Sequence, residues 1–476
     1  MNFEPVIGLE IHVELKTKSK MFSNAPVTYG KEPNTQTVPL DLAFPGTMPT
    51  VNKEAVIYAI RVSNALHMKI DHELHFDRKN YFYSDLPKGY QITQNLRPIG
   101  SDGYLEIEVE GKKKKIGIER LHIEEDTCKQ LHFKDFTLLN YNRAGTPLIE
   151  IVSRPELRSG LEAMKYVEMI RSIVVFSDVS DGKMEEGSLR CDVNISLRPI
   201  GSEKFGTKVE IKNINSISYI QKAIDFEVAR QTKMLLNNEP IRQETRRYDS
   251  AKNETILMRV KTDAVDYKYF PEDNITPIKL SDEFVNNAIA SCPELAESKK
   301  ERYLNVYNLN EYDASLLIAN KDVAKYFDEC AKLCKSYKLL ANWINVEVAS
   351  YCNKNFIDIN SFPLKPDSLV GLVKLVEKKE VNSNQAKDIF AKMVKDNINA
   401  KEAKEALGIS SQISDEDFVK GIINSVLEEN PQAIIDYKDG KDRALGFMVG
   451  QVMKKSQGKV NPKLTKDLLL EELSKR

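Results

Sequence analysis

Two carboxylates and an imidazole alternate along one short segment near the amino terminus. Glu10, His12 and Glu14 are separated by single residues within an otherwise apolar, alternating run at 6–15. Because every second side chain of a β-strand lies on the same face, these three groups are predicted to project together from one strand. Such a face can bind a divalent cation, or it can be a solvated sheet edge, and the spacing alone leaves both interpretations open.

Acidic residues also end a second predicted strand, at 116–126. Glu124, Glu125 and Asp126 follow one another there, and neighbouring carboxylates repel unless water or a cation lies between them. Neighbouring side chains of a strand face opposite ways, so Glu124 and Glu125 can enter one site only if the strand carries a bulge. A cation site and a merely charged strand end both explain this segment.

Glu150 lies inside the apolar run 147–152, which is predicted to be buried. A buried carboxylate needs a cation, an arginine or a raised pKa, because leaving it unpaired costs several kcal/mol. Arg143 and Arg154 are near in sequence and provide the ion-pair alternative to a metal.

The alternating run 189–197 has an apolar face and a polar face. Its polar side chains are Arg190, Asp192, Asn194 and Ser196. Gly187 and Ser188 precede it, and glycine lets backbone N–H groups approach an anion. Glu210 shares a face of the next strand, 209–211, with Lys208 and Lys212. Such a surface suits a nucleotide with magnesium or manganese better than zinc, although the sequence has no typical glycine-rich phosphate loop.

Only a β-sheet could bring these groups together, and the alternation of apolar and polar residues predicts such a sheet. The first 290 or so residues combine short alternating strands with turns and one amphipathic helix at 216–236. Helical spacing dominates later, over 311–335, 366–378 and 384–396, with a turn-like break near Gly408. The sequence therefore predicts an α+β fold: an antiparallel-sheet domain over 1–294, then two small all-helical domains over 295–408 and 409–476.

Composition restricts the class of protein. The chain has 476 residues, 29% of them charged, and a formal net charge of −1, so any nucleic acid must bind to local basic patches. No secretory signal or membrane-spanning run is expected, and six dispersed cysteines fit buried thiols in a reducing cytoplasm. Cys330 and Cys334, four apart on a predicted helix, fit buried thiols better than a metal site.

Strings in order along nearly the whole chain resemble the family of B subunits of tRNA-dependent amidotransferases. They are VIGLEIHVEL at 6–15, FDRKNYFYSDLPKGYQITQ at 76–94, IERLHIEEDTCK at 118–129, NYNRAGTPLIEIVSRPE at 140–156, SDGKMEEGSLRCDVNISLRP at 180–199, EIKNINS at 210–216, QETRRYD at 243–249, DYKYFPE at 266–272 and GFMVGQVMKKSQGKVNPKLTKDLL at 446–469. The resemblance implies a glutamine-synthetase-like catalytic domain, an amidase (A) subunit and a small C subunit as partners, and ATP and magnesium as requirements.

The resemblance also implies roles for particular residues. Magnesium would be held by Glu10, His12, Glu125 and Glu150, and a second cation or the nucleotide by Glu124, Asp192 and Glu210. We further predict phosphate contacts by Lys79, Lys88, Ser188 and Arg190, and substrate contacts by Arg143, Tyr81 and Tyr83. The two tyrosines would stack on the terminal adenosine of the tRNA, although core packing explains these aromatic residues equally well.

A basic tail completes the set of predicted sites. Between 441 and 466 there are seven Lys or Arg and one acidic residue. A solvated helical face explains this composition, but with the resemblance we predict binding of the tRNA body. The predicted tRNA-binding residues are Lys441, Arg443, Lys454, Lys455, Lys459 and Lys463.

The predicted function is ATP-dependent phosphorylation of the side-chain carboxylate of Glu-tRNA(Gln) or Asp-tRNA(Asn). Ammonia from the amidase partner would then displace the phosphate. The alternative is a noncatalytic tRNA-binding scaffold, in which Glu150 would have an arginine partner and no cation.

Overall fold

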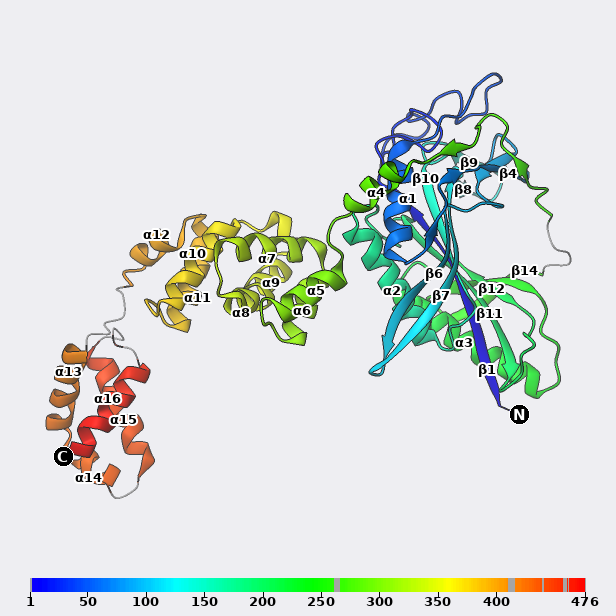
Figure 1. Cartoon of the computed structure of the whole chain (residues 1–476). Helices are drawn as coiled ribbons and strands as arrows, with labels where there is room; N and C mark the ends of the chain where they lie inside the picture. Colours follow the sequence, from blue (N-terminus) through cyan, green and yellow to red (C-terminus); the bar gives the residue numbers. More distant parts are fainter. Residues whose placement is uncertain are drawn as a thin grey trace. The chain divides into compact units, whose positions relative to one another are not determined.

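The computed structural model describes residues 2–260, 266–409, 416–438, 441–456, 460 and 462–475. The chain divides into two compact units, 1–296 and 297–476. The first unit contains the large sheet, and the second is built from helices (Figure 1).

Within the described residues of the first unit, nine strands form one sheet. They are β1 (Phe3–Glu14), β2 (Lys69–Ile70), β6 (Gly100–Val109), β7 (Lys112–Glu125), β10 (Pro147–Ser153), β11 (Leu189–Pro199), β12 (Val209–Lys212), β13 (Glu244–Asp249) and β14 (Glu254–Val260). Their order is β14-β13-β12-β11-β1-β10-β7-β6-β2. Neighbouring strands are antiparallel except β12 and β13, which are parallel.

The two faces of the sheet differ because its strands alternate apolar and polar residues. Ile7, Ile11 and Val13 of β1 are fully buried in the core, whereas Glu10 and His12 between them remain half-buried. Three helices cover the apolar face: α1 (Lys53–Ala65), α2 (Gly160–Phe176) and α3 (Ile217–Leu236) (Figure 1). The opposite face is therefore left for the polar side chains.

Short strands flank the main sheet. They are β3 (Glu73–Leu74), β4 (Asp77–Asn80), β5 (Tyr90–Thr93), β8 (Lys129–His132), β9 (Thr137–Asn140), β15 (Phe270–Pro271) and β16 (Ile278–Lys279), and α4 (Asp282–Ala290) follows them. Strand β4 pairs with both β5 and β15. This pairing brings the segment before β15 next to β4, although Arg78 and its partner Phe270 are far apart in the sequence.

The second unit has two separate apolar clusters, one within 303–403 and one within 419–473. Its helices are α5 (Ala296–Asn305), α6 (Glu311–Ile318), α7 (Lys321–Leu333), α8 (Tyr337–Asn342), η1 (Trp343–Val348), α9 (Ala349–Asn355), η2 (Ile359–Ser361), α10 (Pro366–Glu377), α11 (Ser383–Asp396), α12 (Ala400–Ala406), α13 (Glu416–Glu429), α14 (Pro431–Lys438), α15 (Asp442–Lys455) and α16 (Pro462–Lys475). The division of this unit into two domains near 408 stays a prediction.

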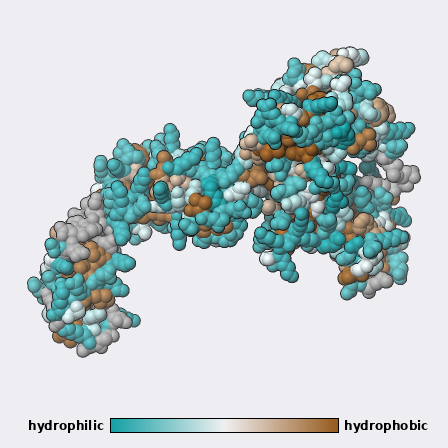
Figure 2. All heavy atoms as spheres, in the orientation of Figure 1, coloured by the Kyte–Doolittle hydropathy of each residue, from teal (hydrophilic) through white to brown (hydrophobic). Residues whose placement is uncertain are grey.

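The structure confirms the coarser part of the predicted fold class, because an antiparallel-dominated sheet with helices is followed by a helical region. The glutamine-synthetase-like architecture stays a prediction. The predicted helical run 311–335 is two helices: the first ends at Ile318, and Asn320 caps the second by accepting from the backbone N–H groups of Asp322 and Val323. Cys330 and Cys334 are buried in the first helical cluster. Across the described ranges, no helix is both long and apolar enough to cross a membrane. Hydrophilic side chains cover most of the visible face of each unit (Figure 2).

Candidate active site

Strand register brings distant polar residues together on the face that the helices leave open. His12 of β1 lies opposite Glu150 of β10, which in turn lies opposite His122 of β7. On its other side, β1 sets Glu10 opposite Asp192 and His12 opposite Arg190 of β11. Residues opposite one another in antiparallel strands point to the same face, so the pairing of four strands builds this cluster.

The first group consists of His12, Glu124 and Glu150, with His122 beside them. The Nε2 atom of His12 lies 3.1 Å from a carboxylate oxygen of Glu150 and 3.7 Å from one of Glu124. His122 Nε2 lies 3.4 Å from Glu124 and 3.7 Å from Glu150. Ligand atoms of His12, Glu124 and Glu150 all lie within 4.8 Å of one another, which suits a single cation.

The two imidazoles and the two carboxylates of this group stabilise one another. Burial disfavours the charged form of His12, but its hydrogen bond to Glu150 and the charges of Glu150 and Glu124 outweigh this and raise its pKa to about 9. Burial likewise opposes ionisation of Glu150, but His122 and His12 lower its pKa below the ordinary range. Without a metal, His12 is therefore protonated at neutral pH, beside the ionised carboxylate of Glu150.

The second group consists of Glu10, Asp192 and Glu210, whose ligand atoms also lie within 4.8 Å of one another. Asn194 donates a hydrogen bond of 2.9 Å to Glu10, and Thr245 donates one of 2.9 Å to Glu210. Burial and the nearby charges of Glu150 and Asp192 raise the pKa of Glu10. Three carboxylates so close together call for a compensating positive charge.

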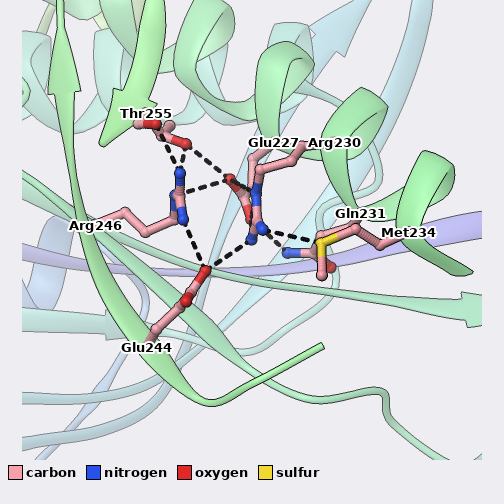
Figure 3. Close-up of polar contacts among 7 residues, drawn as sticks. All are labelled: Glu227, Arg230, Gln231, Met234, Glu244, Arg246 and Thr255. Carbon is pink, nitrogen blue, oxygen red and sulfur yellow. Dashed lines mark hydrogen bonds and ion pairs between the residues drawn. The ribbon is translucent and has the colours of Figure 1, made fainter. Parts of the chain in front are cut away.

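A buried ionic network fixes the strand that carries Thr245. Glu227 of α3 is fully buried and accepts hydrogen bonds from Arg230 (2.5 Å), Gln231 (2.9 Å) and Thr255 (2.9 Å), as drawn in Figure 3. Glu244 of β13 accepts from Arg230 (3.0 Å) and from Arg246 (2.8 Å). The network ties α3 to β13 and β14 on one side of β13, and Thr245 projects from the other side toward Glu210.

Both groups line one pocket. Its other lining residues are Lys79, Thr93, Gln94, Asn95, Arg120, His122, Lys212, Tyr267 and Tyr269. The ammonium of Lys79 lies 4.9 Å from the ring centre of Tyr267, and its pKa is raised because the charge of Glu124 and its other neighbours outweighs the effect of burial. Carboxylate oxygens with one imidazole form a donor set that fits magnesium or manganese, so the residues present fit such an ion.

Glu125 lies outside this pocket, which does not fit the magnesium-ligand role predicted for it. Its carboxylate pairs with Lys88 and accepts the backbone N–H of Ile92 at 3.1 Å. Lys88 is thereby also engaged away from the pocket. The reason is the alternation of β7, which is regular at this end, so Glu124 takes the site-facing position and Glu125 the opposite one.

The other residues predicted to contact phosphate or substrate, Arg190, Arg143 and Ser188, each contact a neighbouring carboxylate. Arg190 projects beside His12 and donates to Asp126 at 2.7 Å, and Arg143 lies 3.4 Å from the same Asp126 oxygen. The hydroxyl of Ser188 donates to Asp181 in the preceding loop. Neither arginine nor Ser188 lines the pocket of the two groups.

The predicted RNA contacts are distributed over both units. Tyr81 packs against Tyr83 and Tyr267, with ring centres 5.8 and 6.0 Å apart, and the Tyr83 side chain is 59% exposed. In the tail, Lys454 and Lys463 are exposed, as is Arg443, while Lys441 and Lys455 pair with Asp436 and Glu429. Lys459 lies outside the described residues.

His122, Tyr267 and Tyr269 line the pocket but were not predicted from the sequence. Lys212 also lines it, as expected from the strand face that it shares with Glu210. His122 could have been predicted from the sequence, because it precedes Glu124 by two residues in the same strand and so lies on the same face. The two tyrosines could not have been predicted, because only the pairing of β4 with β15 brings them to the site.

Known proteins similar to this chain identify the family to which it belongs. The family model described as the GatB/GatE catalytic domain matches residues 5–286, and that of the GatB domain matches 325–473. Proteins named as the B subunit of aspartyl/glutamyl-tRNA(Asn/Gln) amidotransferase are similar to this chain over the full length of both chains. Those of Geobacillus thermodenitrificans and Staphylococcus carnosus are 49% identical, and that of Bacillus cereus is 50% identical. The chain belongs to this family of tRNA-dependent amidotransferase B subunits.

Proposed function

We propose that this chain carries the ATP- and magnesium-dependent step of tRNA-dependent amidation. In this step the side-chain carboxylate of Glu-tRNA(Gln) or Asp-tRNA(Asn) attacks the γ-phosphorus of ATP, which gives an acyl phosphate and ADP. Ammonia then attacks the carbonyl carbon, the bond from carbon to the phosphate oxygen breaks, and the nitrogen loses a proton. The products are the amide and inorganic phosphate.

One observation carries this proposal: two groups of residues that could each hold a cation line a single pocket together with Lys79. In-line phosphoryl transfer needs neutralisation of charge and correct positioning more than a protein nucleophile. Magnesium bound at these groups supplies neutralisation of the phosphate oxygens. His12, Glu124 and Glu150 would hold one ion, and Glu10, Asp192 and Glu210 a second one.

The positively charged side chains near the pocket would each bind a particular part of the substrates. Lys79, at the wall of the pocket, would neutralise the phosphoryl group in transfer. Arg190 and Arg143, held by Asp126 next to the first group, would bind the remaining phosphates or the substrate. Tyr81, Tyr267 and Tyr269 would exclude water from one side of the pocket and position the end of the tRNA.

The names of the relatives support a complex of several subunits. The relatives are named as B subunits, and we propose that this chain likewise acts in a complex with an amidase (A) subunit, which supplies ammonia, and a small C subunit. A glutamine-synthetase-like architecture for the first unit belongs to the same proposal. The exposed Arg443, Lys454 and Lys463 would contact the phosphates of the tRNA body.

The scaffold alternative is less well supported. It requires an arginine partner for Glu150, but among the described residues the ion pairs of Glu150 are with His12 and His122. Arg143 pairs with Asp126 and Arg154 with Asp102. A carboxylate paired with two imidazoles fits a cation site better than a structural ion pair.

Transfer of an oxygen isotope tests the proposed chemistry. Glu-tRNA(Gln) labelled with oxygen-18 in the side-chain carboxylate is supplied to the complete complex with ATP, magnesium and glutamine. An acyl phosphate intermediate passes one labelled oxygen to inorganic phosphate in each turnover. Amide formation without any label in the phosphate would contradict the proposal, and labelled tRNA without ATP provides the background.

A further inference from the structure

Lys212 occupies the second group of carboxylates. Its ammonium nitrogen lies 2.6 Å from an oxygen of Asp192 and 3.3 Å from one of Glu210. These are two of the three carboxylates that could hold a cation there. The side chain projects from the last residue of β12 and lines the same pocket.

The ammonium and a divalent cation would compete for the same oxygens. The Lys212 ammonium donates a hydrogen bond to Asp192 and forms an ion pair with Glu210, so it takes up carboxylate oxygens that a cation would need. A magnesium or manganese ion contacts its carboxylate ligands at about 2.0–2.2 Å. An ammonium still bonded to those carboxylates would then lie in close repulsive contact with the ion.

Two of the three carboxylates, Glu10 and Glu210, are held by hydrogen bonds from other strands. Asn194 fixes Glu10 and Thr245 fixes Glu210, and β13 itself is held by the network around Glu227. Lys212 has a flexible four-carbon stem, and its side chain is 33% exposed. Entry of a cation should therefore move Lys212 and leave Glu10 and Glu210 in place.

We propose that Lys212 is an internal counter-ion of the second cation site, which a divalent cation displaces. The released ammonium then turns to the phosphate oxygens of the nucleotide that shares the pocket. This inference rests on the proposed function, and it adds an order of events to it. One cation binds without nucleotide, and the second binds tightly only when nucleotide phosphates give Lys212 a new partner.

Manganese binding tests the inference without any turnover. Free Mn²⁺ is counted by electron paramagnetic resonance in titrations of the purified complex, with and without a non-hydrolysable ATP analogue. The wild type should bind one Mn²⁺ tightly alone and a second one tightly only with the analogue. Lys212→Met, which keeps the stem and removes the charge, should bind the second Mn²⁺ at least about tenfold more tightly without the analogue. Lys212→Gln provides a second variant in case the first folds poorly.

The direction of the change distinguishes this role from others, because loss of an ordinary positioning residue weakens binding. Lys79→Met removes another ammonium from the same pocket, next to Glu124, and should change the second affinity much less. Unchanged or weaker second binding in both Lys212 variants would overturn the inference. Tight binding of two Mn²⁺ ions by the wild type without nucleotide would also overturn the inference, but it would leave the proposed function intact. No Mn²⁺ binding under any condition would overturn both.

Discussion

Glu124 and Glu125 are neighbours in β7, yet their carboxylates lie on opposite sides of the strand. Glu124 lies beside His12 and His122 in the first cation group, whereas Glu125 pairs with Lys88 outside the pocket. Both are buried, and both look equivalent in the sequence. A matched pair of adjacent variants can therefore separate a metal ligand from a structural ion pair.

Glu124→Gln should weaken the tighter Mn²⁺ site by at least about tenfold, because it removes a charged ligand of that site. Glu125→Gln should leave that affinity within about threefold, because the carboxylate of Glu125 does not reach the pocket. Both affinities are measured by the electron paramagnetic resonance titration of Mn²⁺ without nucleotide. Equal losses in the two variants would argue against the geometry of the first group.

Cation binding at the first group should release a proton. The pKa of His12 is raised to about 9, so below that pH the metal-free imidazole is protonated, whereas a metal ligand must be neutral. At about pH 7.5 we expect release of nearly one proton per ion, and affinity that rises about tenfold per pH unit and levels off near pH 9. Calorimetry in buffers with different ionisation enthalpies measures the release. Affinity independent of pH between about 7 and 9 would contradict this account.

Loss of the carboxylate at the centre of the Figure 3 network should destabilise the first unit. Glu227→Gln leaves the guanidinium groups of Arg230 and Arg246 partly buried with Glu244 as their remaining carboxylate partner. We expect a loss of about 3 kcal/mol in the free energy of unfolding, measured by urea denaturation. Glu168→Gln breaks an exposed pair with Lys165 on α2 and should cost less than about 0.5 kcal/mol. Similar losses for both variants would show that the network contributes little.

Much of this site could be predicted because strand alternation is a local property. Glu10, His12 and Asp192 lie on the face that the apolar pattern assigned to them. The pattern does not specify which strands become neighbours, so the meeting of His12 with Glu150 and His122 required the sheet order. The role predicted for Glu125 rested on resemblance, and the alternation of β7 places it on the other side.

Long-range pairings account for what the sequence could not predict. Tyr267 enters the pocket only because β15 pairs with β4, and nothing in the local sequence indicates that pairing. Lys212 was visible beside Glu210, but its contact with Asp192 depends on the register of β11 with β12. The break between α6 and α7 was missed because the apolar spacing continues across Asn320, and only the cap defines it.

The exposed basic residues of the tail should contribute to tRNA affinity in a salt-dependent way. A variant combining Arg443→Ala with Lys454→Ala should bind tRNA more weakly, and the slope of log affinity against log salt should fall by about two. Filter binding between about 50 and 200 mM salt measures both quantities. Lys113→Ala, on the exposed start of β7, is the control and should leave the slope unchanged. An unchanged slope in the double variant would assign these residues to a solvated face.

The most direct test of the central claim is tRNA-dependent ATP hydrolysis by the complete complex with Glu150→Gln in place of the wild-type chain. Glu150 is buried between His12 and His122, and the substitution keeps its shape while removing its charge. Folding is checked by urea denaturation and tRNA binding by filter retention, with Glu168→Gln as the surface control. We expect hydrolysis stimulated by mischarged tRNA to fall at least about a hundredfold while tRNA affinity is retained. Hydrolysis at the wild-type rate by a folded, tRNA-binding Glu150→Gln complex would contradict the claim that this sheet face carries the phosphoryl-transfer step.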